Sequence, residues 1–245
     1  LHADSAAPVP GFGTVAKLPA NTRIVQDMNI EHDDSAIVIY MQGTDDSEKT
    51  RATISLLATV LRTPFYDKLR TEQQLGYIVN AGTLPILKTN GLVLYIESPV
   101  ADPLTLEENI DSFLAAYAGT LATMDEVMFN DIKAGLVNGM RQPPERLNGL
   151  SGRYWSDILI EEYAEDSTLA MADAIDALTL ADINAWYAQH VVNVDAGRLV
   201  ARSAGRPLRQ QFAAKRMEAA DTVVLTDRST AYREFKQGTQ QFEFQ

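Results

Sequence analysis

The order of predicted strands and helices along the chain indicates an α+β fold. Segments of strand composition come first, followed by one helix, two more strands, several consecutive helices and a last strand. Helices that are grouped, rather than alternating one by one with strands, favour a sheet covered largely on one face. We therefore expect a mainly antiparallel sheet with helices packed largely on one of its faces.

The length of 245 residues suits one large domain or two small ones, and 46% hydrophobic residues allow a sizeable core. Residues 1–20 are rich in Pro and Gly and show no periodicity, so we interpret them as a linker or lead-in. Residues 21–245 are predicted to form a single domain, with a mixed, polar tail from about residue 206. Phe235, Phe242 and Phe244 are candidate docking points in that tail.

The first part of the domain is predicted to be a strand pair followed by a helix. Residues 23–30 and 36–41 have strand composition, and residues 31–34 read as a hairpin turn between them. Both faces of the second strand are apolar, as expected for a central strand covered on both sides. Residues 45–47 can cap a helix that runs to about Arg62, with a buried stripe formed by Ile54, Leu57, Ala58 and Leu61.

The stretch from Phe65 to Val79 has the composition of a short helix that passes directly into a strand. Pro64 suits the first turn of a helix, Gly76 suits its end, and the residues from Tyr77 onward suit a strand. Arg70 and Tyr77 are then placed on opposite sides of one tight junction. A guanidinium and a phenol at such a junction could hold a peptide, but they could not cut one.

The rest of the sequence predicts a second strand pair followed by a series of helices. Strands are predicted at 77–84 and 92–96, with Asn90-Gly91 as a turn in a loop longer than two residues. Helices are expected from Asp102, from about Asp125 and from about Glu145, and Thr179–Asp182 resembles a capping box that opens another. The expected buried residues are Leu106, Ile110, Phe113, Leu114, Tyr117 and Leu121 in the first of these helices, Met128, Ile132, Leu136 and Met140 in the second, and Leu147, Leu150, Tyr154 and Ile158 in the third. Residues 197–203 read as a closing strand.

Charge and composition exclude several classes of partner and site. The net charge of −12 argues against binding to nucleic acid or anionic lipid. The absence of cysteine excludes disulfides, thiolate zinc sites and a cysteine nucleophile. No apolar run approaches the ~20 residues that a membrane helix needs. We expect a soluble protein, with periplasm and cytoplasm left open as compartments.

The chain shows no motif that supplies catalysis by itself. His2, His32 and His190 have no neighbours at metal-ligand spacing, and the phosphate-loop, dinucleotide-binding and serine-hydrolase motifs are missing. Residues 31–34 could collect a surface cation, although turns are rich in Asp for backbone reasons. The sequence therefore predicts no zinc site, no bound cofactor and no catalytic residue in this chain.

The segment Leu69-Arg-Thr-Glu-Gln-Gln-Leu-Gly-Tyr77-Ile-Val79 resembles a signature of the insulinase/pitrilysin family of zinc metallopeptidases. In that family Leu-Arg-Thr is followed by two variable residues, Gln-Leu-Gly-Tyr, one residue and Val. Phe65, Arg153-Tyr154-Trp155 and Glu234-Phe235-Lys236 are similar to flanking features of the family. The similarity runs from about Thr22 to about Phe242.

This resemblance implies the fourth, non-catalytic α/β domain of a peptidase that carries its zinc in another domain. By position, Arg70 and Tyr77 match residues that contact the bound peptide and support the reacting carbonyl. The implied partners are peptide substrates and the N-terminal catalytic half, and this chain alone is expected to be inactive. A stand-alone scaffold subunit that pairs with a separate catalytic chain, and an inactive core protein without a protease partner, are the alternatives.

Overall fold

The structure is a computed structural model that describes residues 14–160, 162, 166–193, 195–217, 222–225 and 230–242. His2, Phe244 and most of the predicted lead-in fall outside these residues. The elements in chain order are β1 (Arg23–Asp27), β2 (Ser35–Gln42), α1 (Glu48–Tyr66), the π-helix η2 (Asp67–Glu72), β3 (Ile78–Thr83), β4 (Gly91–Ser98), α2 (Pro103–Ala122), α3 (Glu126–Arg141), α4 (Leu147–Leu159), α5 (Ser167–Asp176), α6 (Leu180–His190), β5 (Arg198–Ser203), the 3-10 helix η3 (Arg206–Leu208), α7 (Arg209–Lys215), β6 (Thr222–Leu225) and α8 (Thr230–Gly238).

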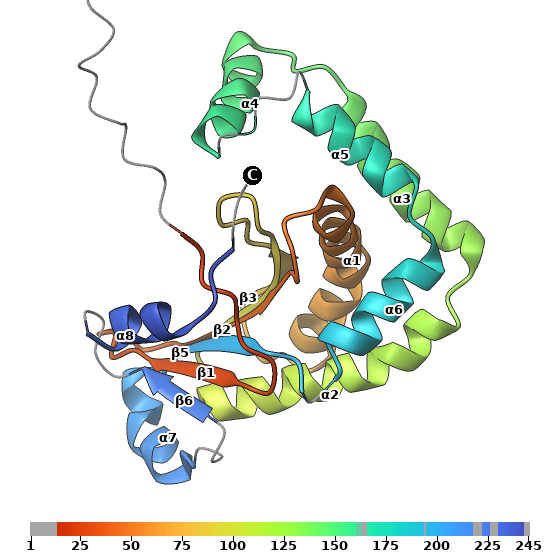
Figure 1. The fold of residues 1–245 in the computed structure, drawn as a ribbon. Coiled ribbons are helices and arrows are strands. Elements are labelled where there is room, and N and C mark those ends of the chain that lie inside the picture. Colours follow the sequence, from red (N-terminus) through yellow and green to blue (C-terminus); the bar gives the residue numbers. More distant parts are fainter. Residues whose placement is uncertain are drawn as a thin grey trace, which may run out of the picture.

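The strands form one mixed sheet in the order β3-β4-β2-β5-β1-β6. Pairing is antiparallel from β3 to β5, whereas β1 is parallel to both of its neighbours, β5 and β6. Helices α1, α2, α3, α5 and α6 lie on one side of this sheet, α4 stands apart from it, and α7 and α8 lie near its β1–β6 end (Figure 1). The predicted α+β class with helices on one face is confirmed, and the expectation of a mainly antiparallel sheet holds only for the β3–β5 part.

The predicted hairpin turn at residues 31–34 is wrong. β1 and β2 follow each other in the chain but do not pair, because β5 lies between them. Ile24 and Val25 are both fully buried, so β1 is covered on both faces and is not an edge strand of a hairpin. Turn residues between two strands indicate that the chain reverses there, but they carry no information about which strand pairs with which.

β2 is a central strand, as predicted, but its two faces differ. Ile37 and Ile39 are fully buried on the face toward the helices. On the other face Tyr40 is buried while Val38 is partly exposed, so this face of the sheet is only partly covered.

Helix α1 passes through Pro64, where a new helix was expected to begin. The chain stays helical to Tyr66 and continues as the π-helix η2. Leu61, Phe65 and Leu69 are all fully buried, and the Phe65 ring meets Phe113 of α2 edge-on at 5.3 Å. Burial of this continuous apolar stripe outweighs the one backbone hydrogen bond that a proline removes.

The consecutive helices agree with the prediction to different degrees. All six apolar positions predicted for α2 are buried, and the capping box that opens α6 is present. In α3 the buried residues are Phe129 and Val137, whereas Met128 is 56% exposed and Ile132, Leu136 and Met140 are only partly buried. The predicted stripe was offset because α3 packs beside α5, a helix that the sequence did not indicate.

Helix α4 departs furthest from expectation. None of its residues is buried, and Leu147, Leu150, Tyr154, Trp155 and Ile158 are all exposed. Figure 1 shows α4 apart from the sheet, at the far end of the helical side of the molecule. The apolar periodicity predicted the helix correctly but not its burial.

The remaining segments complete the fold around the sheet. The β3–β4 hairpin forms as predicted, but its turn lies at residues 87–88, where Leu87 has a φ of 51°, and not at Asn90-Gly91. Residues 15–17 pair with residues 240–242, and Phe242, one of the expected docking points, is buried there. No helix in the described ranges is long and apolar enough to cross a membrane.

Candidate functional site

Arg70 and Tyr77 were the two residues singled out from the sequence, and the Arg70 side chain contacts the Tyr77 backbone. Arg70 Nε donates a hydrogen bond to the Tyr77 carbonyl oxygen (3.1 Å). The guanidinium also lies over the ring of Tyr66, 5.1 Å from its centre. The first contact holds Arg70 beside the residue that precedes β3, and the second holds it against the end of α1. The predicted junction is therefore present, and it places the Arg70 side chain against the backbone of Tyr77.

The backbone between them is shaped by the π-helix and one glycine. The amide of Gln73 donates to the Lys68 carbonyl (3.1 Å), which is the wider spacing of a π-turn. Gln74 then adopts a left-handed conformation with a φ of 53°. A Cβ on Gly76 would overlap the carbonyl oxygen of Glu97, so only glycine lets the chain approach β4 this closely. This approach places Tyr77 beside Glu97.

The phenol of Tyr77 lies between two carboxylates. Its Oη is 2.8 Å from Glu97 Oε1 and 2.9 Å from Asp34 Oδ2, although the side chain is 47% exposed. Hydrogen bonds to Glu97 first, and to Asp34 second, raise the pKa of Tyr77 above its usual value. The phenol therefore stays protonated at neutral pH, with its proton shared with these carboxylates.

Glu97 is held by a second tyrosine on the same strand. Tyr95 lies two residues before it on one face of β4, and its hydroxyl donates to Glu97 Oε2 (2.7 Å). The Tyr95 and Tyr77 hydroxyls keep the pKa of Glu97 below its usual value, so Glu97 is ionised at neutral pH. Burial, followed by this hydrogen bond, raises the pKa of Tyr95 to about 12.

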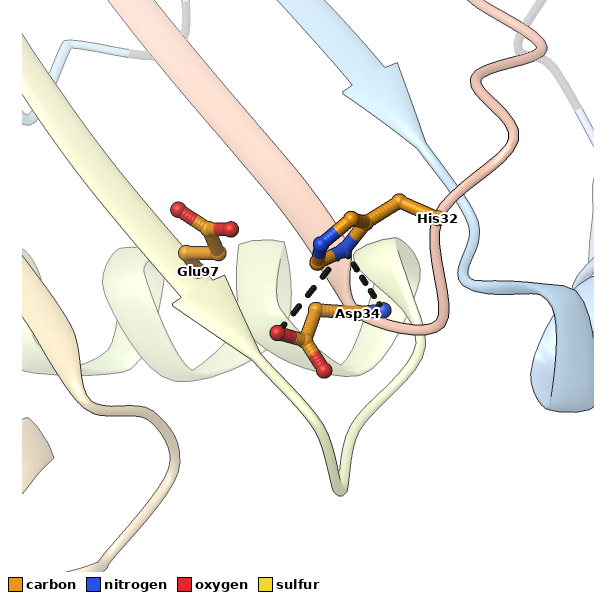
Figure 2. Close-up of side chains that lie close together, drawn as sticks. All are labelled: His32, Asp34 and Glu97. Atoms are coloured by element: carbon orange, nitrogen blue, oxygen red, sulfur yellow. Dashed lines mark hydrogen bonds and ion pairs between the residues drawn. The ribbon is translucent and has the colours of Figure 1, made fainter.

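His32 and Asp34 reach the same place from the connection between β1 and β2. The Asp34 amide donates to His32 Nδ1 (3.1 Å), and this nitrogen is 3.8 Å from Asp34 Oδ2. One ligand atom from each of His32, Asp34 and Glu97 lies within 4.8 Å of the others, as Figure 2 shows. The sequence indicated the 31–34 segment as a weak cation candidate, but it could not indicate Glu97, which comes from a different strand.

The other residues considered in the sequence lie elsewhere. Asp33 binds Arg206 (2.7 Å) and Glu31 binds Arg209 (3.1 Å), so neither joins the Tyr77 group. His190 is near the end of α6, with its ring 5.0 Å from that of Trp186, and burial lowers its pKa. In the described ranges, the group of side chains that could hold a metal ion is His32, Asp34 and Glu97.

Comparison with known proteins shows which family the chain resembles. The profile described as PQQ synthase PqqF-like, C-terminal lobe domain 4, matches residues 56–155, which include both Arg70 and Tyr77. The insulin-degrading enzyme of Mus musculus is 29% identical over 175 residues, and the alignment covers 71% of this chain and 17% of the relative. The Nardilysin-like protein of Arabidopsis thaliana is 24% identical over 175 residues, covering 69% and 17%. The chain is similar to the C-terminal domains of insulinase-family proteins.

Solved structures agree on the fold of this domain. Pitrilysin superposes with a TM-score of 0.77 at 21% identity, covering 94% of this chain and 24% of that chain. A structure titled peptidase M16 inactive domain, from Pseudomonas fluorescens, gives a TM-score of 0.58 at 14% identity, covering 80% and 47%. The family is one of metallopeptidases, and this chain spans less than a fifth of the insulin-degrading enzyme and Nardilysin-like sequences that it matches.

Proposed function

We propose that this chain is the C-terminal, non-catalytic unit of an insulinase-type zinc metalloendopeptidase. In this proposal residues 21–245 form one domain that completes a peptide-binding chamber. Arg70 and Tyr77 contact the bound peptide, and the chain hydrolyses nothing alone. The observation that carries the proposal is the half-exposed Tyr77 side chain, whose backbone carbonyl accepts a hydrogen bond from Arg70 Nε (3.1 Å), in the part of the chain that the family profile matches.

The chemistry of the two side chains suits support of a carbonyl group. A phenol or guanidinium aimed at a developing oxyanion stabilises the transition state, and removing such a donor costs roughly 2.7–4 kcal/mol. Neither group activates water at neutral pH, which is the task of a metal ion in this class of enzyme. Tyr77 and Arg70 therefore act as assistants to chemistry located on another part of the enzyme.

The described residues do not fit a catalytic zinc site of the family type. Such a site needs three protein ligands, an open position and a carboxylate that is free to act as a base. Here both Asp34 and Glu97 lie within hydrogen-bond distance of the single Tyr77 hydroxyl, and among the described residues His32 has no second histidine beside it. In this proposal the catalytic zinc therefore belongs to the partner half of the enzyme.

Steady-state kinetics of the full-length enzyme test the proposal. Tyr77→Phe should lower kcat by roughly 100-fold or more while KM changes little, since the hydroxyl acts in the transition state. Tyr154→Phe, at a tyrosine that is 54% exposed on α4, is the matched control and should have no effect. An effect of Tyr77→Phe confined to KM would show uniform binding and contradict the proposed role.

The purified chain provides a second, independent test. It should cleave none of the peptides that the full-length enzyme cleaves, under the same buffer and zinc concentration. Hydrolysis by the pure chain that is abolished by a chelator would overturn the assignment as a non-catalytic unit.

A separate scaffold subunit is the second candidate. It is favoured by the exposed apolar side chains of α4 and by the fold similarity to a chain described as an inactive peptidase domain. A coding sequence for His-x-x-Glu-His in the same reading frame upstream would favour the single enzyme. Restoration of activity on mixing with a separately encoded catalytic chain would favour the subunit.

A further inference from the structure

We propose that His32, Asp34 and Glu97 bind a divalent metal ion beside Tyr77. The three residues come from the β1–β2 connection and from β4, so the fold assembles the site and no sequence motif does. The ion would have a regulatory role, through the hydrogen bonds that Tyr77 can make.

The donor set matches the ligands of first-row divalent ions. Imidazole nitrogen and carboxylate oxygen are both ligands of zinc, at about 2.0–2.2 Å. The candidate atoms lie within 4.8 Å of one another, so a small inward movement brings them to one ion. His32 can make this movement because its side chain is 58% exposed and belongs to a loop. Figure 2 shows the ring nitrogen that is not bonded to Asp34 directed toward Glu97.

Asp34 and Glu97 differ from the acidic residues next to them in the partners that their carboxylates have. Asp33 and Glu31 each form an ion pair with an arginine. Within the part of the chain that the structure describes, no lysine or arginine makes an ion pair with Asp34 or Glu97. Among the described residues the basic partner of these two carboxylates is His32, and a divalent cation shared by all three side chains would offset the repulsion between the carboxylates.

The hydrogen bonds of Tyr77 give a further reason. A hydroxyl has one proton, yet Tyr77 Oη is within 2.9 Å of a carboxylate oxygen on each side. When both carboxylates are ionised, one of these two oxygen–oxygen contacts has no hydrogen between the atoms. A metal ion that accepts lone pairs from Asp34 and Glu97 would offset the repulsion across the contact that lacks a hydrogen.

Binding of the ion would also change what Tyr77 can do. The carboxylate lone pairs that now accept the Tyr77 proton would be used for the metal, which leaves the phenol free to donate to another acceptor. If the proposed function holds, that acceptor is a peptide carbonyl, and the ion would then control the availability of Tyr77.

Calorimetric titration of the isolated chain tests the site. After treatment with a chelator, the chain should bind one Zn²⁺ or Mn²⁺ per molecule at pH about 7.5, where an ordinary imidazole is mostly neutral. His32→Gln, Asp34→Asn and Glu97→Gln should each weaken binding by at least about tenfold, the scale of loss seen when ligand shells are altered. His2→Gln and His190→Gln are the controls and should leave binding unchanged, and circular dichroism verifies that each variant is folded.

Tyr77→Phe separates this site from a simple surface cluster. Because the phenol competes with the ion for carboxylate lone pairs, the variant should bind the metal at least as tightly as the unaltered chain. No binding, binding that survives Glu97→Gln, or binding lost with His2→Gln would overturn the proposal. None of these measurements uses peptidase activity, so failure of the metal site and failure of the proposed function are distinguishable.

Discussion

Replacing Arg202 by methionine should destabilise the domain only slightly, although Arg202 is fully buried and charged. Its Nε donates to Asp27 Oδ1 (2.8 Å), and its guanidinium lies 5.3 Å from the centre of the Phe212 ring. Glu107 is a more distant partner at 3.7 Å. The residue thus links β5 to β1, α2 and α7.

The expected loss of stability depends on the ion pairs that Asp27 and Glu107 keep after Arg202 is replaced. A hydrogen bond between charged groups contributes roughly 1.5–3 kcal/mol, and removing a buried guanidinium also removes a desolvation penalty of several kcal/mol. After the change Asp27 still binds Arg216 (2.6 Å), and Glu107 still binds Arg23 (2.7 Å). Neither carboxylate is left without a cation, so we expect Arg202→Met to cost about 1–2 kcal/mol.

Asp27→Asn is the informative comparison. It keeps the shape of the side chain but leaves the fully buried guanidinium of Arg202 without its nearest anion, for which we expect a loss of about 3 kcal/mol. Urea denaturation followed by circular dichroism gives both free energies of unfolding. A loss for Arg202→Met equal to or larger than that for Asp27→Asn would refute this reasoning.

Three further changes test other parts of the structure. Gly91→Ala should cost about 1–3 kcal/mol, measured by thermal denaturation, because its Cβ would overlap the buried ring of Tyr40; no loss would show that the ring moves freely. Glu162→Gln should lower stability by about 1 kcal/mol at pH 7, because Glu162 binds Arg51 through two hydrogen bonds at a partly exposed site. Those bonds hold the pKa of Glu162 below its ordinary 4.5, so the stability that Glu162 contributes is complete above pH 4.5 and is lost as the pH falls through the lowered pKa. A stability difference between the unaltered chain and Glu162→Gln that persists at low pH would contradict this role of the ion pair. Trp155→Gln should change the free energy of unfolding by less than about 0.5 kcal/mol, since the side chain is 61% exposed, and a larger loss in urea would show that α4 is packed.

The sequence predicted the candidate site where the information is local. The helix end, Gly76 and the change to strand composition placed Arg70 and Tyr77 together, and the 3.1 Å contact between them follows from that junction. Glu97 and Tyr95 were missed because their approach to Tyr77 depends on the register between β3 and β4. Alternation along a strand shows which residues share a face, but it does not show which neighbouring strand faces them.

The fold, like the site, was predictable where the information is local. Buried faces of α1 and α2 follow from apolar periodicity, because one face of each helix packs against the sheet or a neighbouring helix. The same reasoning failed for α4, whose apolar residues are exposed. An apolar period of 3.6 residues indicates that a helix has an apolar face. It does not show whether the surface that packs against this face belongs to the same chain.

The position of β5 between β1 and β2 has a consequence for how the chain folds during synthesis. β2, α1, β3 and β4 are close in sequence and pair or pack with one another, so they can assemble as soon as they leave the ribosome. Among the strands of this sheet β1 is made before the others, yet its partners are made last: Asp27 and Arg202, which meet in the finished sheet, are 175 positions apart. Until β5 and β6 emerge, the strand that carries Ile24 and Val25 has apolar faces and no partner, which is the condition that favours aggregation. Truncation before residue 198 would make that condition permanent.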